Sequence, residues 1–179
     1  SHVWAGTVNS VALAKTLGCN IHGGYSLNVT NTAAFEWYEQ LGLTDLELSY
    51  ELTLKQSAKI GGSLPRGLLL YGRLPLMLCR NCPGKNDGKN CKNCNGTTWL
   101  TDRKNIKFPV QCDYGCSEVL NAVPLTMSDR ISDISGMNFG ILRFTVENSV
   151  EIEETFQQFL YQKVPLGHYT RGLYEKGIK

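Results

Sequence analysis

The sequence predicts an α/β fold with a parallel sheet. Short apolar runs typical of strands begin near residues 20, 46 and 67, and segments with helical spacing of apolar residues separate them. A repeat of about 20 to 30 residues is the rhythm of βα units. Crossovers of this kind are right-handed, which leaves a doubly wound sheet or a (β/α) barrel. With 179 residues, 42% of them hydrophobic, we expect a single domain over residues 1–179.

The first 80 residues supply most of these signals. The side chains predicted to cap the N-termini of helices are Asn9, Asn31 or Thr32, and Thr53. Gly18 and Gly42 stand where the first two helices should end. The strands are predicted over residues 20–25, 46–49 and 67–71.

The cysteine-rich segment then interrupts the pattern. Residues 81–96 are rich in Gly, Asn and Lys and predict a loop without a core of its own. Residues 99–102 and 107–112 predict a β-hairpin. The β/α pattern returns with a strand over 140–145 and a helix whose N-terminus Ser149 is predicted to cap, and residues 165–179 predict an irregular tail.

The cysteine content points to a metal site in a reducing compartment. Six of the seven cysteines lie between Cys79 and Cys116, and only Cys19 stands apart. An odd number of cysteines, most of them clustered, argues against a disulfide framework. In a sequence with no visible secretory signal, such a cluster is typical of metal binding. No run of 18 apolar residues is present, so we expect no membrane span and a cytoplasmic location. A net charge of +2 neither demands nor excludes a nucleic-acid partner.

The clustered cysteines form two C-x2-C pairs and a C-x3-C pair: Cys79, Cys82, Cys91, Cys94, Cys112 and Cys116. A C-x2-C pair brings two thiolates to one ion, and the neighbouring Arg and Lys residues lower thiol pKa values. One ligand set uses both C-x2-C pairs and would form a zinc knuckle. The other drops Cys79 and adds Cys112, and would hold zinc or a 4Fe–4S cluster. We favour the second set, Cys82, Cys91, Cys94 and Cys112, with Cys79 and Cys116 as alternates.

An ordered series of motifs resembles the collagenase-like U-32 peptidase family. The motifs run from about residue 8 to the end of the chain. They are GYSLNVTN at 24–31, LSYELT at 48–53, YGRLPLM at 71–77, NCP at 81–83, LTDR at 100–103, FPVQC at 108–112, LNAVPL at 120–125 and TRGLY at 170–174.

This resemblance implies a partial barrel. The family's catalytic module resembles a (β/α) barrel, and this chain matches its later part. The expected fold is therefore the C-terminal part of such a barrel, with the cysteine-rich metal-binding loop and hairpin inserted at 78–116. An incomplete barrel leaves a strand edge and an apolar face uncovered. We expect a C-terminal fragment in which the missing N-terminal half, or a second copy in a homodimer, covers them.

The resemblance also implies a function. Several members of the family are oxygen-independent hydroxylation factors that act on transfer RNA, ribosomal RNA or a quinone precursor and carry a 4Fe–4S cluster on four cysteines. It places the cluster on Cys82, Cys91, Cys94 and Cys112, with zinc as the replacement in aerobic preparations. The expected function is iron–sulfur-dependent hydroxylation of an RNA base, the fragment alone being inactive. A collagenase-like peptidase and a zinc-stabilised binding module are the alternatives, although no G-x-S-x-G or H-E-x-x-H motif is present.

Four further residues are candidates for catalysis because they follow predicted strands, where barrel active sites form. They are His22, Asn28, Glu51 and Arg73. Glu51 would act as a general acid or base, and Arg73 would bind a phosphate or carboxylate. Each also has a structural interpretation: Asn28 as a helix cap, Glu51 in the first turn of a helix, Arg73 in a turn and His22 at the surface.

Overall fold

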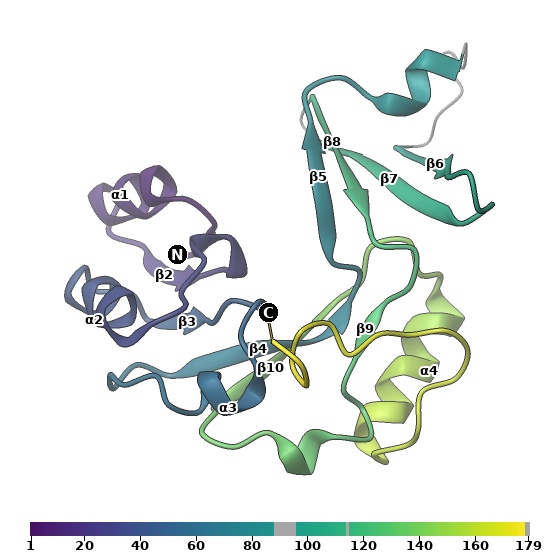
Figure 1. The fold of residues 1–179 in the computed structure, drawn as a ribbon. Helices are drawn as coiled ribbons and strands as arrows, with labels where there is room; N and C mark the ends of the chain where they lie inside the picture. The colour runs from purple at the N-terminus through teal and green to yellow at the C-terminus, as the bar shows by residue number, and fades with distance from the viewer. Residues whose placement is uncertain (88–95, 114, 178–179) are drawn as a thin grey trace. The chain divides into compact units, whose positions relative to one another are not determined.

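The computed structural model describes residues 1–87, 96–113 and 115–177, and the chain divides into two compact units. The first comprises residues 1–70, 129–142 and 171–179, and the second comprises residues 71–128 and 143–170. Figure 1 shows the helices and strands of both units.

The first unit is built on a parallel sheet. Its strands are β1 (His2–Ala5), β2 (Asn20–Gly23), β3 (Asp45–Glu47), β4 (Arg66–Gly72) and β10 (Phe139–Arg143), in that spatial order. The pairs β1–β2, β2–β3 and β3–β4 are all parallel, which confirms the predicted βα rhythm. Strand β1 was not predicted from the sequence. Strand β4 is buried almost throughout, as a central strand of a parallel sheet requires.

Short helices connect these strands: α1 (Val8–Thr16), α2 (Thr32–Gln40) and α3 (Leu54–Ser57), with 3-10 turns at Tyr25–Leu27 and Ile131–Asp133. Asn31 and Thr53 cap α2 and α3 as predicted. The prediction that Asn9 caps the first helix is wrong, because Thr7 is the extended residue there and exchanges hydrogen bonds with Ser10.

The second unit contains an antiparallel sheet in the order β5–β8–β7–β6. Its strands are β5 (Pro75–Cys79), β6 (Thr97–Thr101), β7 (Lys107–Asp113) and β8 (Cys116–Leu120). The β6–β7 pairing confirms the predicted hairpin. Parts of the predicted 78–116 insertion belong to this sheet, and a 3-10 helix, Pro83–Asp87, follows β5.

The second unit also contains the end of β4, the short strand β9 (Leu125–Thr126) and α4 (Ser149–Leu160). Strand β9 pairs antiparallel with Tyr71 and Gly72. Asn148, rather than the predicted Ser149, caps α4, because its side chain accepts hydrogen bonds from two helix amides and Glu151 reciprocates.

The fold class is thus mixed α/β with two sheets. Residues 1–87, 96–113 and 115–177 form no closed barrel, and a partial barrel stays a prediction. In the same ranges no helix is long and apolar enough to cross a membrane.

Candidate metal centre

Strand register places two of the clustered cysteines on one face of the antiparallel sheet. Cys79 on β5 and Cys112 on β7 are both paired with Ser117 on the strand between them. Directly opposed residues in antiparallel strands project to the same face. Cys79 and Cys112 therefore flank Ser117 from either side.

Cys82, in the loop after β5, completes a small cluster with Cys112 and Ser117. The Cys112 sulfur lies 3.2 Å from the Ser117 hydroxyl oxygen. The Cys82 thiol hydrogen-bonds to both of these side chains. Two predicted ligands that are far apart in the sequence are thus in direct contact.

The surroundings of Cys82 favour its thiolate. Burial raises the pKa of the Cys82 thiol, but hydrogen bonds from Cys112, Ser117 and the backbone amides of Gly84 and Lys85 outweigh this effect, and the pKa is lowered. Amide groups directed at a sulfur stabilise the charge that a metal-bound cysteine carries. This donor set fits a thiolate-ligated centre.

Cys116 lies on the other face of the sheet. It precedes Ser117 on β8, and successive side chains of a strand point to opposite faces. It lines a separate cavity of about 230 Å³ together with Glu118 and Arg143, which form an ion pair of 2.8 Å. Of the two alternates, Cys79 shares the face of Cys112 and Cys116 does not.

The other two predicted ligands, Cys91 and Cys94, lie outside the described residues. Within the ranges that are described, no group of three or more His, Cys, Asp or Glu side chains is placed to hold a metal ion. The structure therefore shows a pair of thiols where the sequence predicts four ligands.

The catalytic candidates His22 and Asn28 belong to the first unit and have structural partners there. His22, in β2, donates to or accepts from His2 at 2.8 Å through Nε2, and its Nδ1 lies 2.7 Å from an Asp45 carboxylate oxygen. Both ring nitrogens are thus occupied by protein partners. Asn28 adopts a left-handed conformation (φ 51°) that ends a 3-10 turn, which is a structural role that asparagine tolerates.

Glu51 is exposed in the turn that precedes α3. A different carboxylate, that of Glu47, is 1% exposed at the end of β3, and one of its oxygens accepts a hydrogen bond from the Tyr25 amide at 2.9 Å. Sequence reasoning missed Glu47, because the strand was predicted over residues 46–49 and Glu47 lay inside it, whereas β3 ends at Glu47.

Arg73 belongs to the second unit, and its guanidinium group is bound by other residues of that unit. Its Nη1 donates to the carbonyl oxygens of Asn121, at 3.1 Å, and Ala122. Its Nε lies 3.6 Å from a Glu147 carboxylate oxygen. The guanidinium is therefore largely occupied, and its predicted role in binding an anion stays a prediction.

Three comparisons, with protein-family models, with curated proteins and with solved structures, find no match to this chain.

Proposed function

We propose that the second unit holds a cysteine-ligated 4Fe–4S centre that serves the hydroxylation of an RNA base. The observation that supports this proposal is the contact of Cys82 with Cys112 beside Ser117, with backbone amides directed at the Cys82 sulfur. The RNA substrate and the reaction rest on the resemblance to the U-32 family. A 4Fe–4S cluster supplies one-electron chemistry when it is bound.

The chain's own contribution is to arrange the ligands. Cys82 and Cys112 would hold the centre from the described residues, and Cys91 and Cys94 would complete it. Strands β7 and β8 fix Cys112 and Ser117 in register, so that one ligand comes from a rigid element. Lys104 and Lys107, in and beside the β6–β7 turn, supply positive charge for an RNA backbone.

Zinc is the second candidate, because the same pair of thiols suits a tetrahedral thiolate site equally well. In that case the second unit would be a zinc-stabilised binding module. The peptidase alternative has only the family resemblance behind it.

Anaerobic purification followed by measurement of iron, acid-labile sulfide and zinc distinguishes these functions. We expect about four iron and four sulfide per chain, with absorbance near 400 nm, for a bound 4Fe–4S cluster. Cys82→Ser and Cys112→Ser should each lose the iron and the absorbance. Cys19→Ser, outside the cluster, and Cys116→Ser, on the opposite face of the sheet, are the controls and should keep both. One zinc per chain without sulfide would refute the cluster and favour the binding module.

The RNA assignment is tested separately. Because the chain alone is expected to be inactive, the measured quantity is RNA binding. The cluster-loaded wild-type chain should bind total RNA with an affinity that falls as the salt concentration rises, and Lys104→Gln together with Lys107→Gln should weaken this binding. A cluster-loaded chain that binds no RNA would contradict the RNA assignment while leaving the centre intact.

A further inference from the structure

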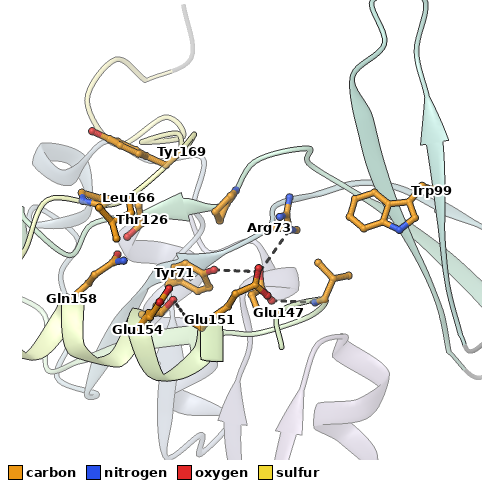
Figure 2. Close-up of a pocket in the computed structure, with 14 residues that line it drawn as sticks. Tyr71, Arg73, Trp99, Thr126, Glu147, Glu151, Glu154, Gln158, Leu166 and Tyr169 are labelled. Carbon is orange, nitrogen blue, oxygen red and sulfur yellow. Dashed lines mark hydrogen bonds and ion pairs between the residues drawn. The ribbon is translucent and has the colours of Figure 1, made fainter. Parts of the chain in front are cut away.

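A cavity in the second unit lies apart from the cysteine cluster. Its volume is about 350 Å³, within the range of small-ligand sites. Tyr71 at the end of β4 lines it, as do helix α4 and the segment that follows the helix, which contributes Leu166 and Tyr169. Figure 2 shows Glu154, Gln158, Leu166 and Tyr169 on one side of Tyr71, with Trp99 on the other. None of the cysteines lines this cavity.

The charges that line the cavity are predominantly negative. Arg73 is the one cationic side chain of the lining, and three carboxylates accompany it: Glu147, Glu151 and Glu154. Arg73 already faces Glu147 and donates to two backbone carbonyls. Glu151 and Glu154 therefore make the electrostatic potential in the cavity negative.

Two of the three carboxylates are committed to the protein. Glu147, with 5% of its side chain exposed, accepts hydrogen bonds from the Thr145 amide at 2.7 Å and from the Tyr71 hydroxyl at 3.2 Å. Glu151 accepts from the Asn148 amide at 2.7 Å and so completes the helix cap. These two carboxylates have structural roles.

Glu154 and Gln158 remain. They are four residues apart on α4 and both line the cavity, as residues on one helix face do. Neither side chain has a hydrogen bond or ion pair to another side chain or backbone group within residues 1–87, 96–113 and 115–177. Glu154 therefore offers a carboxylate to the cavity, and Gln158, one turn away, offers a side-chain amide whose oxygen can also accept a hydrogen bond.

Leu166 and Tyr169 lie at the same end of the cavity, with Thr126 beside Leu166. Leu166 is 78% exposed, and Tyr169 lies beside it with 36% exposure. An alkyl chain would pack on Leu166 beside Tyr169.

From this arrangement we infer that the cavity binds an aliphatic cation, an alkyl guanidine or alkyl amine, whose charged head contacts Glu154 and Gln158 and whose stem packs on Leu166 beside Tyr169. This site does not depend on the cysteine centre or on the proposed RNA chemistry. The chemistry is common to a free small amine and to a basic side chain of a peptide.

Calorimetric titration with agmatine, and separately with N-acetyl-argininamide, tests the inference on the full chain. Glu154→Gln should weaken binding about tenfold, the cost of losing one charged hydrogen bond. Glu153→Gln is the matched control, because Glu153 is exposed on the same helix and does not line the cavity. Tighter binding of agmatine would identify a free amine as the source, and tighter binding of N-acetyl-argininamide a peptide side chain.

Three outcomes would overturn the inference. They are no heat of binding with either probe at millimolar concentration, equal weakening by Glu154→Gln and Glu153→Gln, and equal affinity for the neutral analogue butylurea. Thermal unfolding of each variant establishes that the chain is folded. Since Glu154 is exposed at the helix surface, its amide variant should retain the wild-type unfolding temperature.

Discussion

At the scale of the residue, the pKa of Tyr71 makes the stability of the chain depend on pH. Its side chain is buried, and its hydroxyl faces the carboxylate of Glu147. Burial, and then the negative charge of Glu147, raise the pKa of Tyr71 to about 12, against smaller opposing effects of Thr155 and then of Arg73. Tyr71 is therefore neutral in the folded chain at every physiological pH.

This raised pKa predicts a loss of stability in alkali. An unfolded tyrosine has a pKa of about 10. Between about pH 10 and 12 the unfolded chain releases a proton that folded Tyr71 keeps, so rising pH favours unfolding. Below about pH 10 the stability that the raised pKa of Tyr71 contributes is fully present. The free energy of unfolding should fall by up to about 1.4 kcal/mol per pH unit in this window, as urea titrations at pH 9, 10, 11 and 12 would measure.

Tyr71→Phe is the matched variant, because it removes the ionising hydroxyl and keeps the ring. It should be less stable than the wild type at pH 8, where the hydrogen bond to Glu147 is lost. Its stability should then depend less on pH between 10 and 12. Tyr174, which burial also protects by raising its pKa, leaves a residual dependence in both chains. Identical slopes in the two proteins would contradict the assignment to Tyr71.

At the scale of the element, the connection from β4 to β5 depends on a glycine. Gly72 has φ 146°, a value that other residues rarely adopt. A Cβ atom at this position would lie 2.7 Å from the backbone oxygen of Arg143. Both the backbone conformation and the space therefore require glycine where the chain enters the antiparallel sheet.

Gly72→Ala should lower the free energy of unfolding by roughly 3 kcal/mol, from backbone strain together with steric overlap. Gly18→Ala separates the two effects. Gly18 also has a positive φ, of 64°, but a Cβ there would meet no atom within 4 Å. Gly18→Ala should lower the free energy of unfolding by about 1 kcal/mol, from the left-handed conformation alone. Equal costs in urea titrations of the two variants would show that the contact with Arg143 is unimportant.

At the scale of the whole molecule, the chain combines two kinds of sheet in two compact units. The first unit has a parallel sheet with a core of aliphatic side chains such as Leu46, Leu68 and Leu69. The second unit has a small antiparallel sheet that carries Cys79, Cys112 and Ser117 in one row. A thiolate-bound centre would stabilise the second sheet directly, since binding energy adds to folding energy.

Removal of the metal should therefore act on one unit. A chelator added to metal-loaded protein should speed amide hydrogen exchange in β5, β7 and β8. Exchange in β1–β3 should be unchanged, because no clustered cysteine belongs to that unit. Exchange followed by mass spectrometry of peptides gives both regions in one experiment. Cys82→Ser without chelator should reproduce the pattern, and an equal effect in both units would contradict a local centre.

Local rules were enough to predict several elements. The spacing of apolar residues and the caps Asn31 and Thr53 predicted α2 and α3, because a cap bonds only to amides two or three residues away. The two strand-like segments at 99–102 and 107–112 predicted the β6–β7 hairpin, because strands joined by a short turn pair with each other. The caps of α1 and α4 were harder to predict. Thr7 and Asn148 are the caps, but Asn9 and Ser149 stand close by and have similar chemistry, and only the backbone conformation distinguishes them.

The sequence by itself determined the parallel βα rhythm, the hairpin and the candidacy of Cys82 and Cys112, because these follow from short-range periodicity and from the chemistry of thiols. Only the tertiary structure decided that Cys79 and Cys112 flank Ser117, that Cys116 faces the other way, and that Glu154 and Gln158 line a cavity. Register and packing join residues far apart in the chain, and no local pattern specifies which distant strands or loops will meet.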